Sequence, residues 1–314
     1  MIHGFLGAEP TTAYLLTFTP GRCLGHCAFC AQSTLSKSPM YKLARVAWPE
    51  FDSGEVIDRL GANPGLFSRL CIQTLNYPSF FEALKRIIDG LKEASPTPIS
   101  VSCQPLSDDQ IVELRGLGVE RLSIPLDGAS PKVFEDVKGS GVGGPYRWRM
   151  QVDAISKAVH VFGEGNVTTH VIIGLGETDR EVVNLLWRMI DTGVLTSLFA
   201  FTPIKGTVLE NKRRPSLARY RALQTINYLM NKHELTRDSV VFDDEDRVKK
   251  IYVSKRCLSI IGSGEPFRTF GCPGCNRPYY NENVSGPIYN YPMPLNAEET
   301  QDAMALLKPR IQSI

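Results

Sequence analysis

The chain has 314 residues, of which 43% are hydrophobic and 22% charged, a composition typical of a folded protein with a large core. Its formal net charge of +2 gives no electrostatic support for a nucleic-acid or membrane partner. No apolar stretch reaches the roughly 20 residues of a membrane span, and residues 1–10 lack the basic and apolar regions of a signal peptide. With eight cysteines and no secretory signal, we expect a cytoplasmic protein whose thiolates serve metals.

Strand-like and helix-like segments alternate along most of the chain. Apolar and β-branched runs predict strands at residues 13–19, 68–74, 98–103, 120–126, 166–174 and 196–202. Amphipathic stretches predict helices at 80–93, 107–117, 146–162, 178–192 and 215–232, with further helical material from 131. The alternation predicts parallel βαβ units. We therefore expect an α/β fold in which eight strands close into a (β/α) TIM-type barrel.

The alternation weakens beyond residue 239. The segment 262–294 is rich in Gly, Pro, Tyr and Asn, and a last helix is predicted at 296–309. We therefore predict a barrel over residues 1–255 and a C-terminal cap over residues 256–314 that carries a second group of cysteines.

Three cysteines lie close together just after the first predicted strand. Cys23, Cys27 and Cys30 have the spacing C-x3-C-x2-C, and three thiolates can hold three corners of a [4Fe–4S] cluster and leave the fourth iron open. A zinc site usually has four protein ligands, whereas only His26 stands nearby. The bacterial ferredoxin spacing is different, and a disulfide framework needs an oxidising compartment. The motif therefore predicts a cluster with an open iron.

With Phe29 directly before the third cysteine, the motif resembles that of the radical S-adenosylmethionine (SAM) enzymes. The resemblance implies that SAM chelates the open iron through its amino and carboxylate groups. It also implies that an electron from the cluster breaks the C5′–S bond and that the 5′-deoxyadenosyl radical abstracts a hydrogen atom. An electron donor such as a ferredoxin is then needed, and Phe29 is expected near the adenine.

Later segments resemble the biotin synthase-like branch of this family, over most of residues 13–230. Barrel enzymes carry their active residues at the C-terminal ends of strands, and we expect Gln73 to face the cofactor there. The resemblance assigns Asp127 to the SAM ribose, because a carboxylate can accept hydrogen bonds from both hydroxyls. Asp127 could alternatively be a turn or cap residue.

The segment Ile172-Ile-Gly-Leu-Gly-Glu-Thr178 is similar to the stretch that cradles adenine in that branch. The similarity assigns Ile172, Ile173, Gly174 and Glu177 to cofactor binding. His170 stands where the branch pattern has its first glycine. Taken alone, the glycines could simply end a strand and start a helix, as in many α/β proteins.

Biotin synthase itself carries an additional [2Fe–2S] cluster held by three cysteines and an arginine inside its barrel. Cys71 and Cys103 fall where two of those cysteines would lie, but no cysteine stands near Thr168, where the third is expected. Biotin synthesis is therefore disfavoured. Each of the two cysteines could also be a small buried hydrophobic residue.

A second set of three cysteines stands near the C-terminus: Cys257, Cys272 and Cys275. Pro273 and Gly274 favour a tight turn between the last two. We interpret the set as the ligands of an auxiliary [4Fe–4S] cluster. A zinc knuckle completed by Cys71, Cys103 or a histidine and a redox dithiol are the alternatives.

Two clusters in one barrel indicate sulfur insertion, because replacing C–H by C–S needs both a hydrogen abstraction and a sulfur donor. The tail segment 271–281 looks like that of the biotin synthase-like proteins that form the two-component lipoyl synthase. This resemblance implies a transferase that thiolates an octanoyl-lysyl group on a lipoyl carrier protein, together with a second component. The alternatives are a mutase or maturase resembling methylornithine synthase or the hydrogenase-cofactor maturase, with a structural metal in the tail, and a non-enzymatic cluster-binding subunit.

Overall fold

A parallel sheet of six strands forms the centre of the computed structural model, which describes residues 8–280, 282 and 286–314. Residues 1–7, examined above for a signal peptide, and Asn281 of the tail segment lie outside that description. The strands are β1 (Thr12–Leu16), β4 (Arg69–Gln73), β5 (Ile99–Ser102), β6 (Arg121–Ser123), β7 (Val167–Ile173) and β8 (Val194–Ala200). Their order in the sheet equals their order in the chain, which is the arrangement of a (β/α) barrel.

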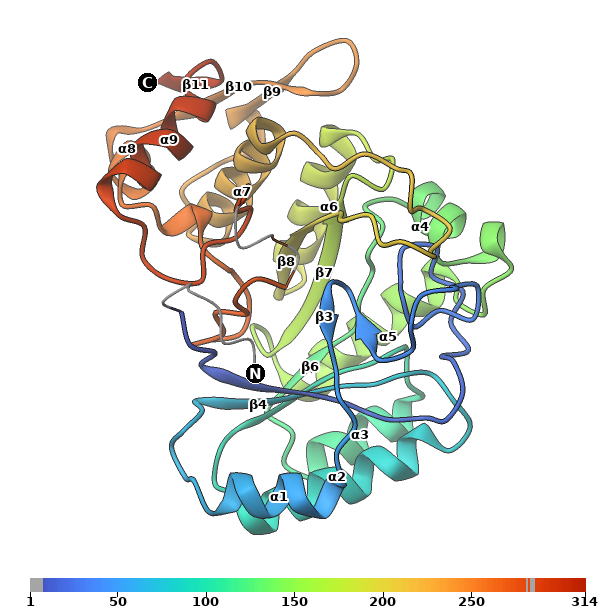
Figure 1. Cartoon of the computed structure of the whole chain (residues 1–314). Coiled ribbons are helices and arrows are strands. Elements are labelled where there is room, and N and C mark those ends of the chain that lie inside the picture. Colours follow the sequence, from blue (N-terminus) through green and yellow to red (C-terminus); the bar gives the residue numbers. More distant parts are fainter. Residues whose placement is uncertain (1–7, 281, 283–285) are drawn as a thin grey trace.

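Helices cover the outer face of this curved sheet (Figure 1). They are α1 (Ser53–Gly61), α2 (Phe80–Ala94), α3 (Asp108–Gly116), α4 (Pro131–Val137), α5 (Trp148–Phe162), α6 (Asp179–Asp191) and α7 (Leu217–Asn231). Their sequences favour this placement, since α2 buries Phe81, Leu84, Ile88 and Leu91 on one stripe. The start of α6 is fixed by a capping box between Thr178 and Glu181. The α/β class is thus confirmed.

The expected eight strands are not reached in the described part of the chain, where the barrel is partial. After α7, β9 (Val240–Phe242) and β10 (Val248–Val253) pair antiparallel, and β11 (Ile311–Ser313) completes a separate three-stranded sheet. The five residues Asp243–Arg247 that join β9 to β10 are too few for a crossover, because parallel neighbours need a connection of about a dozen residues. A small hairpin, β2 (Lys42–Leu43) and β3 (Val46–Ala47), lies outside both sheets.

The C-terminal segment packs back onto the barrel. Helix α9 (Ala297–Leu307) packs against α7, and α8 (Lys255–Gly262) packs against α9 (Figure 1). Cys257, Phe267 and Leu307 belong to the same buried core as the barrel strands. No helix of the described residues is long and apolar enough to cross a membrane.

The inner face of the sheet is lined by small or polar side chains. Strand register places Tyr14, Cys71, Ser100 and Arg121 in one row across β1, β4, β5 and β6. Ser102, Ser123 and Thr168 form the next row. Closed barrels fill these positions mainly with Val, Ile and Leu. The small side chains here leave space for a cavity inside the barrel.

Candidate functional site

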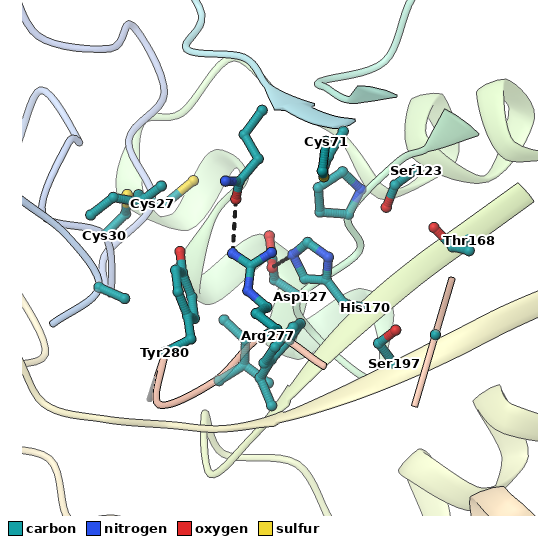
Figure 2. A pocket seen from close by; sticks show the side chains of 18 of the residues that line it. Cys27, Cys30, Cys71, Ser123, Asp127, Thr168, His170, Ser197, Arg277 and Tyr280 are labelled. Atoms are coloured by element: carbon teal, nitrogen blue, oxygen red, sulfur yellow. Dashed lines mark hydrogen bonds and ion pairs between the residues drawn. The ribbon is translucent and has the colours of Figure 1, made fainter. Parts of the chain in front are cut away.

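A cavity of about 290 Å³ lies on the inner face of the barrel. Its walls come from the barrel strands, the loop that carries the first three cysteines, and the C-terminal tail (Figure 2). Seven of the eight cysteines line it: Cys23, Cys27, Cys30, Cys71, Cys103, Cys272 and Cys275. The cavity therefore brings together cysteines that are far apart in the sequence.

The loop that carries Cys23, Cys27 and Cys30 is anchored by backbone hydrogen bonds on several sides. The amide of Cys23 donates to Gln32 at 3.1 Å, and that of Ala28 donates to Val137 at 2.8 Å. The Cys23 Sγ atom accepts hydrogen bonds from the amides of Asn76 at 3.2 Å and Gly25 at 3.4 Å. Amide donors of this kind stabilise the sulfur atoms of iron–sulfur ligands.

Burial disfavours the thiolate form of two of the three cysteines. Burial raises the pKa of Cys27 well above its usual value and raises the pKa of Cys30 to about 12. A thiol must lose its proton to bind iron. The charge of Lys138 offsets part of the effect of burial on Cys27, and iron would supply further positive charge to both thiolates.

Among the described residues, no three His, Cys, Asp or Glu side chains converge tightly enough to hold a single metal ion. In a [4Fe–4S] cluster each thiolate binds a different iron atom, so the ligands surround the cluster instead of meeting at one point. The donor set of three thiols around one cavity fits such a cluster.

Asp127 lies in the cavity wall, as its predicted role requires, but both of its oxygens already have partners. Oδ2 accepts a hydrogen bond from Lys138 Nζ at 2.7 Å. Oδ1 lies 3.0 Å from His170 Nε2, as Figure 2 shows. Burial by itself would raise the pKa of Asp127, but the charge of Lys138 and the contact with His170 outweigh it and lower that pKa. The backbone here has φ of 62°, which Asp tolerates better than most residues.

Glu177 turns its carboxylate into its own loop, away from the cavity. Oε1 accepts the amide of Gly174 at 2.7 Å and lies 2.9 Å from Arg219, and Oε2 accepts the amides of Leu175 at 2.9 Å and Gly176 at 3.0 Å. The carboxylate therefore fixes the shape of the loop. Gly174 and Gly176, with φ of 109° and 136°, adopt backbone conformations that side chains disfavour.

Among the remaining predicted cofactor residues, the neighbours Ile172 and Ile173 face opposite sides of the sheet, because side chains alternate along a strand. Ile172 points inward and lines the cavity together with Phe29 and Gln73. Ile173 points outward into the core, so only its backbone is available to a ligand at this edge.

Two of the three tail cysteines reach the cavity. Tyr14 Oη lies 3.3 Å from Cys275 Sγ and accepts the amide of Arg277 at 2.8 Å. Arg277 extends across the cavity, donates to Gln73 Oε1 at 2.8 Å and lies under the ring of Tyr280 (Figure 2). Cys272 and Cys275 are thus held against the inner face of β1 and β4.

Cys257 corrects the prediction for the tail set. It lies in α8, where its Sγ atom is 3.2 Å from Ser254 Oγ and 3.5 Å from the carbonyl oxygen of Glu234, and it does not line the cavity. Ser254 caps the start of α8 and accepts the amide of Cys257, which places this cysteine in the first turn of the helix. The expected group of Cys257, Cys272 and Cys275 is therefore not assembled.

Sequence reasoning missed several residues that define the site. Lys138 is buried at the end of α4, and His170 was noted only as a departure from a glycine pattern. Arg277 and Tyr280 occupy the middle of the cavity (Figure 2). No local motif marks Lys138 or His170, and Arg277 and Tyr280 belong to the tail segment 271–281, which was noted for its resemblance and not for these two side chains.

Comparison with known proteins identifies the family. The sequence pattern of the radical SAM superfamily matches residues 17–187, which is more than half of the chain. The chain belongs to the radical SAM superfamily. Membership implies a [4Fe–4S] cluster and SAM, and Cys23, Cys27 and Cys30 fall inside the matched segment.

The chain is similar to curated biotin synthases. It is 29% identical over 203 residues to that of Sulfurihydrogenibium sp. (strain YO3AOP1), covering 63% of this chain and 57% of the relative. It is 26% identical over 216 residues to that of Aquifex aeolicus (strain VF5), covering 67% of this chain and 61% of the relative. The chain therefore spans less than two-thirds of the length of these relatives.

Solved structures share the fold. The FeFe-hydrogenase maturase of Carboxydothermus hydrogenoformans has a TM-score of 0.55 at 16% identity and covers 79% of this chain and 54% of its own. Methylornithine synthase has a TM-score of 0.55 at 15% identity and covers 71% of this chain and 64% of its own. At these identities the likeness concerns the radical SAM fold alone.

Proposed function

We propose that this chain is a radical SAM sulfur-insertion enzyme, a component of a two-part lipoyl synthase that thiolates an octanoyl-lysyl group on a lipoyl carrier protein. The observation that carries the proposal is that Cys272 and Cys275 line the same cavity as Cys23, Cys27 and Cys30. When bound, a cluster on the first three cysteines and SAM supply a hydrogen-abstracting radical, and an auxiliary [4Fe–4S] cluster on the tail cysteines supplies sulfide. An electron donor such as a ferredoxin and a second lipoyl synthase component complete the proposal.

The cavity has the chemistry for a hydrocarbon chain. Its apolar lining includes Leu16, Phe29, Leu43, Phe199 and Phe201. Such side chains bind an alkyl group by removing its surface from water, at about 0.8 kcal/mol per buried methylene group. Burial also protects a carbon radical from solvent and from side reactions.

The chain differs from the biotin synthases at the position that matters for their product. Thr168 lies on the inner face of the barrel, in the cavity wall, where the resemblance calls for a third cysteine of their barrel cluster. A hydroxyl is a poor iron ligand compared with a thiolate. This difference and the tail cysteines favour the lipoyl synthase assignment over biotin synthesis.

The test is an anaerobic incubation of the iron-loaded protein with SAM, a reductant and an octanoyl-lysyl peptide, followed by mass spectrometry. We expect 5′-deoxyadenosine together with an octanoyl peptide that has gained sulfur, and neither product from the Cys27→Ala variant. An unacylated lysyl peptide serves as the substrate control. Deoxyadenosine without any thiolated peptide, with the second component present, would refute sulfur insertion and favour a mutase or maturase.

A further inference from the structure

Three cysteines from distant parts of the chain face the same end of the cavity. Cys71 is the register partner of Tyr14 on the neighbouring strand, and the Tyr14 hydroxyl lies 3.3 Å from Cys275 Sγ. Cys272 lies three residues before Cys275 in the same turn, where the Cys275 amide donates to the Cys272 carbonyl oxygen at 3.1 Å. Cys71, Cys272 and Cys275 all line the cavity.

The turn that carries Cys272 and Cys275 is fastened to the amino-terminal end of the barrel. The Thr11 hydroxyl donates to the carbonyl oxygen of Gly274, and Asn276 Nδ2 donates to that of Glu9 at 2.7 Å. On the other side, Gly271 lies so close to β8 that an added Cβ atom would be 2.6 Å from Ser197 Oγ. The turn is therefore held on two sides, with its thiols directed into the barrel.

Buried positive charge surrounds these three thiols. The side chains of Arg69 and Arg121 interact electrostatically with Cys272, and that of Arg277 interacts with Cys71 and Cys275. Arg69 and Arg121 are only 4% and 5% exposed.

These arginines also have unused donors. Among the described residues, Arg69 Nη1, Arg121 Nε and Arg277 Nε have no hydrogen-bond partner. Buried donors without partners cost about 1–3 kcal/mol each. Arg121 and Arg277 line the cavity, so an anionic group with several acceptor atoms at this end would satisfy their free donors, whereas Arg69 is paired with Glu120. A cluster with thiolate ligands carries negative charge and acceptor sulfides.

We propose that Cys71, Cys272 and Cys275 are the protein ligands of the auxiliary cluster, with Arg69, Arg121 and Arg277 around it, at the end of the cavity remote from Cys23, Cys27 and Cys30. The inference deepens the proposed function, because it identifies the site of the second cluster. It places one ligand on a barrel strand and two on the tail, so the cluster joins the two parts of the chain.

The other two cysteines provide matched controls. Cys257 is buried in α8 with Ser254 and Glu234 as its contacts. Cys103 lines the cavity just beyond β5 and is buried, but it has neither a tail cysteine nor an arginine among its electrostatic partners. Neither is a ligand in this proposal.

The test is iron content and electron paramagnetic resonance (EPR) of the full chain after anaerobic reconstitution. The wild type should hold about eight irons, and Cys71→Ala, Cys272→Ala and Cys275→Ala should each hold about four. In these variants the EPR signal of the remaining cluster should still shift on addition of SAM, which also reports correct folding. Cys257→Ala and Cys103→Ala should keep about eight irons. Retention of eight irons in Cys71→Ala, or their loss in Cys257→Ala or Cys103→Ala, would overturn the assignment.

A second measurement needs no variant. In the iron-loaded protein, Cys71, Cys272 and Cys275 should resist alkylation, and removal of the iron by a chelator should increase the labelling rate of all three together. Labelling of Cys71 in the iron-loaded protein would refute the assignment. Because both measurements count ligands and not products, the site can hold even if no thiolated peptide forms. Conversely, thiolation by a Cys71→Ala protein that keeps eight irons would refute this ligand set and leave the proposed function intact.

Discussion

The Glu177 carboxylate offers the sharpest test of how the loop after β7 is built. Oε1 serves Gly174 and Arg219, and Oε2 serves Leu175 and Gly176. In Glu177→Gln one oxygen becomes an NH2 group, which cannot accept a hydrogen bond. Whichever way the amide is oriented, two of the four donors lose their acceptor.

The cost follows from the burial of the carboxylate that these donors share. The Glu177 side chain is 0% exposed, and each buried donor left without an acceptor costs about 1–3 kcal/mol. The loss of two acceptors should lower the free energy of unfolding by about 4 kcal/mol. In a protein of this size that corresponds to a fall in Tm of about 8 °C.

The assay is chemical denaturation of the iron-free protein, paired with SAM binding to the reconstituted protein. Glu210→Gln is the matched control, because Glu210 is exposed and accepts the Gly206 amide at 2.6 Å; it should cost less than about 1 kcal/mol. We expect Glu177→Gln to lose stability and SAM affinity together. Unchanged stability with lost SAM affinity would refute the bracing role and make Glu177 a direct ligand.

Two substitutions and one labelling measurement test other parts of the site. Asp127→Asn leaves Lys138 buried without its counter-ion and should lower the free energy of unfolding by about 3–5 kcal/mol at pH 7. Because the folded state lowers the Asp127 pKa, this stability is present above the unfolded pKa of about 3.9 and is lost as the pH falls below it. Urea titrations of wild type and variant should therefore converge in acid. Gly271→Ala should displace the tail from Ser197, so that the protein loses about four irons, and adding Ser197→Ala to that variant should restore them. Gly262→Ala, where an added Cβ meets nothing within 4 Å, should leave the iron content unchanged. Equal iron loss in both glycine variants would contradict this. Burial raises the pKa of Cys103 to about 12, so only about one thiol in 10,000 is ionised at pH 8. Cys103 should therefore stay unalkylated in the folded protein at that pH. Rapid labelling would show that it is accessible.

The local elements were well predicted because their signals are local. The expected helix at 178–192 is observed as α6 (Asp179–Asp191), whose capping box is written in the sequence as Thr178 and Glu181. The strand before the first cysteine motif appears as β1 (Thr12–Leu16). The motif itself predicted the family, because its three cysteines lie in one loop and their spacing can therefore be read directly from the sequence.

The second group of cysteines was predicted only in part, for a physical reason. Cys272 and Cys275 share one turn, so their spacing indicates that they act together. Cys71 joins them through the register of β1 and β4 and a fold that returns the tail to the barrel. Cys257 is nearer to them in sequence, but the cap at Ser254 commits it to a helix. Proximity along the chain is therefore a poor guide to ligands that come from different elements.

The two proposed clusters occupy opposite ends of one cavity, and the barrel interior explains how a substrate could reach both. In Figure 2, Cys27 and Cys30 lie on one side, with Tyr280 below them, and Cys71 lies on the other, with Arg277 in between. Ser100, Ser102, Ser123, Thr168 and Ser197 replace the bulky side chains that fill a closed barrel. Larger side chains at these positions would separate the two proposed clusters. The small inner face is therefore what a two-cluster reaction requires of this fold, and the six-stranded, partial sheet leaves an open side that the tail can enter with Cys272 and Cys275.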